Sequence, residues 1–194
     1  MFIVKMTIHE KLNLEDITLE AERLRLRAFL QSDLNDFYEY ASVKDVYELG
    51  GWKQHTSIKE TQSVLNKFIS GKKTFAIVLK SVNKVVGELG FYESTRLKDD
   101  EKFSQLEIME IGYTLSKDYW GQGLIVEATK AVAEYCFKAL KLDALICTHS
   151  LNNVQSKRVI EKSGFKYLKP AKTFDKTTGS HADGALYILR SQIN

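Results

Sequence analysis

Residues 119–124 read Tyr-Trp-Gly-Gln-Gly-Leu and separate an apolar stretch that ends near Leu115 from the most regular helical pattern of the chain, 124–139. Two glycines one residue apart let the backbone turn tightly with its amide groups exposed. The first turn of the following helix adds N–H groups without helical partners, and the helix dipole places positive charge there. The stretch predicts a backbone site for an anion such as phosphate. An ordinary strand-to-helix turn is the alternative.

The segments around this stretch predict alternating strands and helices. Residues 106–115 predict a strand whose apolar side chains change face, which suggests a β-bulge near 108–110. After the helix over 124–139, residues 144–149 predict a strand and 154–163 a helix that Gly164 ends. Residues 165–168 and 185–189 predict the two closing strands.

The N-terminal half predicts hairpins with helices between them. Leu24 and Leu26 alternate with arginines, which is typical of a strand with one face in water. Ser32 or Asp33 predicts the start of a helix that reaches residue 41, and a capping box at 57–60 predicts a second helix that ends at Gly71. Strands over 74–80 and 84–93 then form a hairpin, followed by a charged loop over 94–104.

Together these elements predict an α/β (α+β) fold with one mixed sheet of about seven strands and about four helices. The first half of the sheet is expected to be antiparallel and the second half partly parallel. Residues 1–18 show no pattern and are interpreted as an N-terminal extension, while 19–194 are interpreted as a single domain. A length of 194 residues fits one domain.

Composition excludes several classes of protein. Lysine and arginine number 28 against 25 aspartates and glutamates, spread along the chain, which argues against a nucleic-acid partner. Cys136 and Cys147 lie in apolar stretches without metal-ligand spacing. The sequence opens without the pattern of a secretory leader, and no apolar run approaches the ~18 residues of a membrane span, so a cytoplasmic protein without a membrane partner is expected.

Other motif classes do not fit the glycines or the histidines. A dinucleotide-binding fingerprint would need a small residue where Val126 stands, and a P-loop would need Ser or Thr where Lys73 follows Gly71-Lys72. No Gly-x-Ser-x-Gly elbow of a hydrolase is present. His149 and His181 lack a second ligand at metal spacing, so a metal site is not expected.

Two segments taken together resemble the GNAT acetyltransferases. The pyrophosphate-binding pattern of that family, Arg/Gln-x-x-Gly-x-Gly/Ala, matches 120–125 as Trp-Gly-Gln-Gly-Leu-Ile. Its later Asn-x-x-Ser-x-Arg-x-x-Glu-Lys-x-Gly-Phe pattern matches 153–165, with the Asn taken at Asn152 or Asn153. Residues 19–27 and the helix after Asp33 resemble the opening of the RimJ/RimL-like branch. The resemblance covers about 19–190, and it departs from the pattern at Trp120 and at Ile125, whose β-carbon could crowd a phosphate.

The resemblance implies acetyl-CoA as co-substrate and no metal. It implies that the thioester lies between the strands 106–115 and 144–149, which splay apart in this family. The residues that it assigns to cofactor binding are Gly121, Gln122, Gly123, Leu124, Ile125, Val126, Asn152, Tyr113 and Thr114.

Two residues are candidates for proton transfer. Glu110 shares a strand face with Gly112, whose bare backbone would let a ligand approach, and is interpreted as the general base, or else as a solvated carboxylate. Ser156 stands where similar acetyltransferases protonate the departing thiolate, or else it only caps the helix. Tyr167 and Tyr187 are alternative acids, or else core residues.

The sequence thus predicts an N-acetyltransferase that moves acetyl from acetyl-CoA to a primary amine by direct attack. The resemblance favours the N-terminal α-amine of a protein or peptide as acceptor. The alternatives are a small-amine or drug acetyltransferase and a catalytically silent acyl-CoA-binding regulatory module. A monomer or a homodimer is expected.

Overall fold

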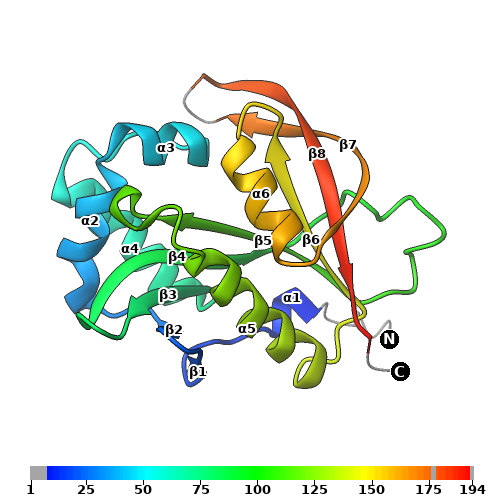
Figure 1. Ribbon diagram of the computed structural model, residues 1–194, viewed down its shortest axis with the longest axis horizontal. Helices are drawn as coiled ribbons and strands as arrows, with labels where there is room; N and C mark the ends of the chain where they lie inside the picture. The colour runs from blue at the N-terminus through cyan, green and yellow to red at the C-terminus, as the bar shows by residue number, and fades with distance from the viewer. Residues whose placement is uncertain (1–7, 176–177, 193–194) are drawn as a thin grey trace, which may run out of the picture.

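A single mixed sheet organises the computed structural model, which describes residues 8–175 and 178–192 (Figure 1). The sheet has eight strands in the order β1-β2-β3-β4-β5-β6-β8-β7. Every neighbouring pair is antiparallel except β5 and β6, which are parallel. The expected arrangement, antiparallel first and partly parallel later, is confirmed. The strands are β1 (Leu19–Glu20), β2 (Leu24–Ala28), β3 (Thr74–Leu79), β4 (Lys84–Tyr92), β5 (Ile108–Leu115), β6 (Ala144–Ser150), β7 (Lys166–Asp175) and β8 (Ser180–Arg190).

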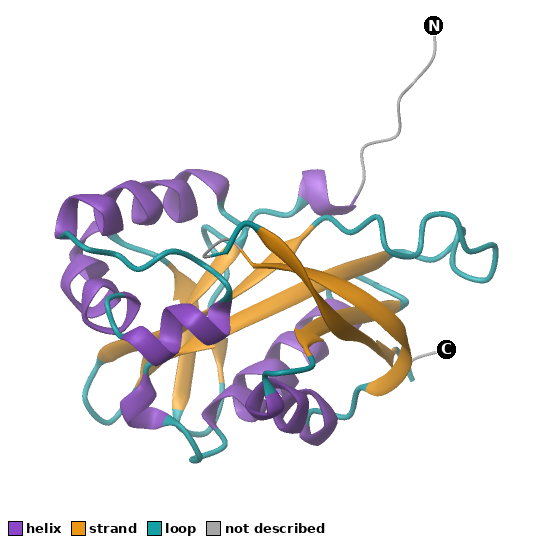
Figure 2. Ribbon diagram, turned by 90° about the horizontal axis from the view of Figure 1, so that it is seen from above, coloured by secondary structure: helices purple, strands orange, loops and turns teal. Residues whose placement is uncertain are grey.

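Helices cover both faces of the sheet, as Figure 2 shows. On one face α5 packs in the largest hydrophobic cluster, with Leu24 of β2, Ile111 of β5 and Leu145 of β6. On the other face α2 and α4 form a second cluster with β3 and β4, centred on Phe37 and Leu65. The α-helices are α1 (Ile8–Lys11), α2 (Leu34–Ala41), α3 (Lys44–Gly50), α4 (Ile58–Gly71), α5 (Leu124–Lys138) and α6 (Val154–Lys162).

Strands β5 and β6 diverge, and the opening between them divides the sheet. They pair only from Ile108 with Ala144 to Glu110 with Ile146, although β5 continues to Leu115 and β6 to Ser150. Figure 1 shows them running apart, with β4 remaining beside β5 and β8 beside β6. We call this divergence the gap; beyond Glu110 and Ile146 the backbone N–H and C=O groups of β5 and β6 are not paired with one another.

The expected bulge near 108–110 is wrong. Strand β5 pairs without a register shift with β4 on one side and with β6 on the other. The apolar residues change face because both faces of the strand are covered at the start of β5. Met109 lies in the main cluster, whereas Ile108 packs against Leu97 and Phe103 of the loop before the strand. A register shift occurs instead between β3 and β4, at Ile77 and Val78.

Several boundaries differ from those expected. Strands β7 and β8 form a much longer hairpin, and residues 8–18 contribute Leu12 and Leu14 to the main cluster. Ser57 caps α4 through the Glu60 N–H, as expected. Asp33 does not cap α2 with its side chain, because its carboxylate pairs with Arg27 and accepts the Leu30 N–H at 2.8 Å.

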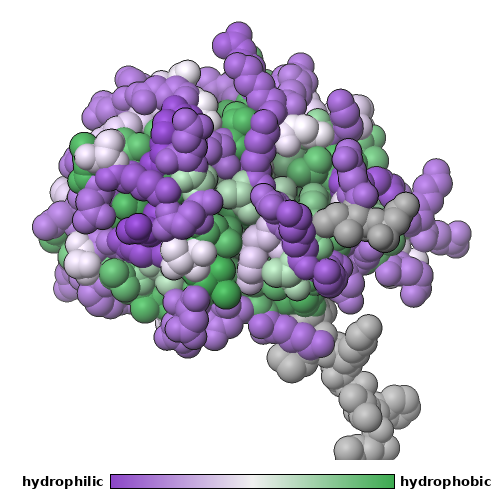
Figure 3. All heavy atoms as spheres, turned by 60° about the horizontal axis from the view of Figure 1, so that its bottom comes forward, coloured by the Kyte–Doolittle hydropathy of each residue, from purple (hydrophilic) through white to green (hydrophobic). Residues whose placement is uncertain are grey.

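The surface mixes polar and apolar side chains. In the face shown in Figure 3, hydrophilic side chains interrupt the hydrophobic ones. Within the part of the chain that the structure describes, no helix is both long enough and apolar enough to cross a membrane.

Candidate active site

The loop at 121–123 has the geometry that its two glycines predicted. Gly121 and Gly123 adopt left-handed φ angles of 76° and 77°, and α5 begins at the next residue, Leu124. All three loop residues are exposed, and no side chain caps the start of α5 among the described residues. The amides of the first turn are thus free for a ligand, and the helix dipole favours an anion there.

Trp120 and Ile125, the two departures from the family pattern, both serve packing. The Trp120 indole N–H donates to the Leu115 carbonyl at 2.9 Å, and its ring packs against both main hydrophobic clusters. Ile125 is buried in the larger cluster. Its side chain therefore points away from the exposed loop and leaves the amide side uncrowded.

A pair of hydroxyl groups links β5 to α6 beside the gap. The Tyr113 hydroxyl lies 3.1 Å from Ser156 Oγ and 3.2 Å from the Ser156 carbonyl oxygen. Burial raises the pKa of Tyr113 well above its ordinary value, so this phenol stays protonated. The two predicted site residues thus form one hydrogen-bonded pair.

Ser156 does not cap its helix. The cap is Asn153, whose side-chain oxygen accepts the Ser156 N–H at 2.9 Å while its amide group donates to the Leu49 carbonyl at 3.0 Å. The hydroxyl of Ser156 is left to contact Tyr113. The capping-only interpretation of Ser156 is therefore wrong, and Asn152 lies in the exposed turn that precedes the cap.

Glu110 stands where β5 and β6 cease to pair. Its carboxylate, 15% exposed, accepts a hydrogen bond from the Thr148 hydroxyl at 2.8 Å and forms an ion pair with Arg96 at 3.1 Å. Arg96 also donates to the Lys172 carbonyl of β7 at 2.8 Å. No sequence pattern predicts a role for Arg96 or Thr148, because each is a single polar residue in a loop or a strand.

The side of Gly112 is already occupied, contrary to the expectation that a ligand would approach there. A β-carbon at Gly112 would lie 3.1 Å from the Tyr92 ring, and one at Gly90 would lie 3.2 Å from the Tyr92 hydroxyl. The two glycines are register partners, so the ring of Tyr92 lies across both strands. Their missing side chains make room for an aromatic residue of the protein itself.

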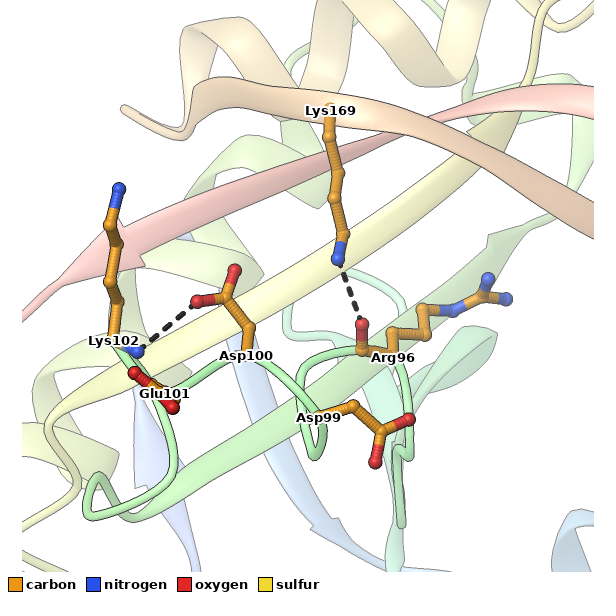
Figure 4. Close-up of a pocket in the computed structure, with 6 residues that line it drawn as sticks. All are labelled: Arg96, Asp99, Asp100, Glu101, Lys102 and Lys169. Carbon is orange, nitrogen blue, oxygen red and sulfur yellow. Dashed lines mark hydrogen bonds between the residues drawn. The ribbon is translucent and has the colours of Figure 1, made fainter.

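A charged pocket of about 500 Å³ adjoins Glu110 through Arg96 (Figure 4). Lys169 of β7 donates to the Arg96 carbonyl at 3.1 Å, which joins the loop after β4 to the β7–β8 hairpin. The charged loop therefore meets the hairpin beside Glu110. The residues around the pocket are Arg96, Asp99, Asp100, Glu101, Lys102 and Lys169.

A second carboxyl group, that of Glu88, is buried on the same face of the sheet as Glu110. Glu88 is opposite Thr114 in register and is only 6% exposed, and the Tyr40 hydroxyl of α2 donates to it. Burial raises the pKa of Glu88 to about 7, against the opposing hydrogen bonds from Tyr40 and Thr114. Sequence reasoning missed this residue, since a glutamate in an apolar strand gives no sign of its partners.

The remaining candidates lie elsewhere. Tyr187 is buried in the main cluster, Tyr167 is exposed on β7, and the exposed His181 contacts Phe174. His149 is buried with its Nδ1 atom 2.7 Å from the Ser150 carbonyl, and its Nε2 has no partner among the described residues. Nor do the described residues contain a group of three or more potential metal ligands.

Comparison with known proteins identifies the family. The model of the acetyltransferase (GNAT) domain matches residues 23–166. The chain belongs to this family. "Probable N-acetyltransferase YjcK" of Bacillus subtilis is 32% identical over 139 residues, which span 70% of this chain and 71% of YjcK.

Solved structures agree with this assignment. A GNAT-family acetyltransferase from Bacillus anthracis, 28% identical, superposes with a TM-score of 0.76 over 90% of this chain and 98% of its own. RimJ of Mycobacterium smegmatis, in complex with CoA-disulfide, shares the fold at 20% identity, with a TM-score of 0.72 over 91% of this chain and 88% of RimJ. The protein is therefore an acetyl-CoA-dependent N-acetyltransferase, as the resemblance implied, with RimJ among its structural neighbours.

Proposed function

We propose that this acetyltransferase acts on the N-terminal α-amine of a protein or peptide. The observation that carries the proposal is the placement of Glu110 and of the Tyr113–Ser156 hydroxyl pair on opposite faces of β5, beside the gap. Glu110 and Tyr113 are three residues apart on one strand, so their side chains point to opposite faces. The thioester then lies between a base on the acceptor side and a hydroxyl pair on the α6 side.

Cofactor binding follows from the loop before α5. The amides of residues 121–126 hold the pyrophosphate of acetyl-CoA, because a helix start with exposed N–H groups and a positive dipole end favours an anion. Tyr113 and Thr114 line the route of the pantetheine chain along the unpaired part of β5, with Asn152 at the start of α6. The thioester carbon is thereby held beside the gap.

Transfer then needs one proton removed and one supplied. The neutral amine attacks the thioester carbon, and its N–H proton passes through water to the Glu110 carboxylate. The tetrahedral intermediate collapses by breaking the C–S bond, and the departing thiolate takes a proton from Ser156. Tyr113, whose phenol stays protonated, keeps its hydrogen bond to Ser156 and stabilises the serine oxygen as the proton leaves. Water then returns a proton to Ser156 and takes the proton from Glu110. The products are the N-acetylated acceptor and free CoA.

The ionisation of the acceptor favours an α-amine. At pH 7 an α-amine with a pKa of about 7.7–8.0 is roughly one tenth neutral, whereas a lysine with a pKa of about 10.4 is neutral only about four times in ten thousand. Glu110 is the one carboxylate at the end of the β5–β6 pairing among the described residues. A site with one such base suits the amine that loses its proton more easily. The resemblance to the RimJ/RimL-like branch favours the same acceptor.

Two matched peptides test the proposal. Each contains one lysine, and they differ only in whether the N-terminus is free or blocked. Release of CoA thiol is measured with acetyl-CoA, and mass spectrometry locates the acetyl group. We expect turnover on the free peptide alone, with acetyl on its N-terminus. Equal rates with acetyl on lysine would contradict the proposal, and no rate on either peptide would favour a small amine.

A further inference from the structure

Arg23, which immediately precedes β2, reaches across to the loop before α5 with most of its hydrogen-bonding groups. Its Nε donates to one Glu127 carboxylate oxygen at 2.8 Å, and its backbone N–H donates to the other at 2.7 Å. Its Nη1 donates to the Gln122 carbonyl at 3.0 Å. Glu127 itself donates its backbone N–H to the Gly123 carbonyl at 3.1 Å. The four residues form a closed ring of hydrogen bonds around the start of α5.

The bond to Gln122 fixes the direction of an amide. In a planar trans peptide the C=O and the following N–H point in opposite directions. Because Arg23 holds the Gln122 carbonyl, the Gly123 N–H is turned away from Arg23. A β-carbon at Gly123 would lie 3.9 Å from Arg23 Nη2, so the guanidinium lies beside the glycine, on the side away from its N–H. The opposite side of the loop is left for the anion. A β-carbon at Gly121 would meet nothing within 4 Å, so the loop is open to solvent there.

The ion pair also removes an unfavourable charge. Glu127 lies in the first turn of α5 and is 15% exposed, so an unpaired carboxylate there would repel a pyrophosphate on the neighbouring amides. Arg23, which is 44% exposed, supplies the opposite charge at 2.8 Å. The family pattern places an Arg or Gln at position 120, but the Trp120 N–H is engaged by the Leu115 carbonyl.

We propose that Arg23, held by Glu127, is a positioning residue for the CoA pyrophosphate: it orients the 122–123 peptide and neutralises Glu127, without contacting the phosphates itself. This inference rests on the proposed binding of CoA at residues 121–126. Removing the guanidinium frees that peptide and leaves the Glu127 carboxylate unpaired beside the anion. An Arg23→Ala variant should therefore bind CoA at least about tenfold more weakly. This is the effect expected when one charge-assisted hydrogen bond is lost at a partly exposed site.

Calorimetry with two ligands tests the proposal. CoA and dephospho-CoA both carry the pyrophosphate, and only CoA carries the 3′-phosphate. Because Arg23 acts through the loop, we expect Arg23→Ala to weaken both ligands by the same factor. Glu127→Gln should weaken both to a smaller degree, and Arg23→Lys should fall between wild type and Arg23→Ala, since an ammonium group has no fork to engage Glu127 and Gln122 together.

Arg25→Ala is the matched control. Arg25 is an arginine of β2 whose Nε pairs with Glu20 at 2.6 Å, at nearly the same exposure as Arg23, and it has no bond to the loop. We expect its affinity for both ligands to equal that of wild type. With an active acceptor peptide, Arg23→Ala should raise KM for acetyl-CoA at unchanged kcat, which general damage to the fold would not do.

Three results would overturn the proposal. Unchanged affinity of Arg23→Ala for both ligands would show that the ring of hydrogen bonds does not act on the cofactor. Weaker binding of CoA alone would place Arg23 on the 3′-phosphate. If Arg23→Ala does not fold, unchanged affinities of both Arg23→Lys and Glu127→Gln would contradict it equally. A wild-type protein that bound neither ligand would instead contradict the proposed cofactor site, and the present inference with it.

Discussion

Ser156 and Tyr113 share one hydrogen bond beside the gap, so their contributions to the reaction should be coupled. If Ser156 protonates the thiolate, Ser156→Ala should lower kcat by about 10²- to 10⁴-fold and leave CoA affinity unchanged. Tyr113→Phe should lower kcat less than Ser156→Ala does, because the Ser156 hydroxyl is still present to donate its proton. Steady-state kinetics and calorimetry measure the two effects. Full activity of Ser156→Ala would remove it from the mechanism.

Glu110 should be needed for the chemical step and not for cofactor binding. A base that accepts the amine proton acts on the acceptor, so Glu110→Gln should lower kcat by about 10²- to 10⁴-fold and leave CoA affinity unchanged. Steady-state kinetics and calorimetry measure the two effects. Glu107→Gln, an exposed glutamate just before β5, is the control. A Glu110→Gln variant with the kcat of wild type would show that Glu110 is not the base.

Glu88 should make stability depend on pH. Its pKa is raised from 4.5 to about 7 in the folded protein, so the folded state binds the proton more tightly than the unfolded state. Protonation of Glu88 therefore contributes to the free energy of unfolding below pH 4.5. This contribution, about 3 kcal/mol, is lost as the pH rises through 7.

Urea unfolding at pH 5 and pH 8 measures this loss. Glu88→Gln cannot ionise, and its amide oxygen can still accept the hydrogen bond from the Tyr40 hydroxyl, so its stability should fall less between the two pH values. Identical pH dependence in wild type and variant would contradict the ionisation of Glu88. Such buried partners cannot be read from sequence, because Tyr40 and Thr114 reach Glu88 only in the folded sheet.

At the scale of elements, the loop and the start of α5 depend on the left-handed conformation of Gly123, with φ of 77°. A β-branched residue strongly disfavours this conformation. Gly123→Val should therefore distort the loop and weaken CoA binding by about tenfold or more, since strain of about 1–3 kcal/mol is added. Gly71→Ala, at the end of α4 where a β-carbon meets nothing within 4 Å, is the control. Equal CoA affinities of Gly123→Val and wild type would contradict the loop assignment.

The elements also show where sequence reasoning succeeds and fails. The α5 helix and its loop could be predicted, because helical spacing and two glycines are local signals. The bulge predicted in β5 was wrong. Ile108 is covered by the loop around Leu97 and Phe103, and this packing arises only in the folded protein. The β7–β8 hairpin was predicted too short because its exposed, polar ends look like loop, whereas each strand is extended by pairing with the other.

For the whole molecule, the two cysteines report on the integrity of the core. Cys136 of α5 and Cys147 of β6 are both buried in the main cluster, and burial raises the pKa of each thiol to about 12. At pH 8 neither should react with a thiol reagent until the core opens. Both should react at once in denaturant. CoA should slow the reaction of the native protein, because it binds only the folded state. Rapid labelling of either thiol in the native protein would contradict this packing.

At the scale of the whole molecule, the proposed site combines three parts: the loop at residues 121–123, the gap between β5 and β6, and the charged pocket. A crystal structure with bound CoA tests this arrangement most directly. The account predicts the pyrophosphate on the amides of residues 121–126 and the sulfur in the gap, near the Tyr113 and Ser156 hydroxyls. CoA bound with its pyrophosphate elsewhere, or with its sulfur outside the gap, would contradict it.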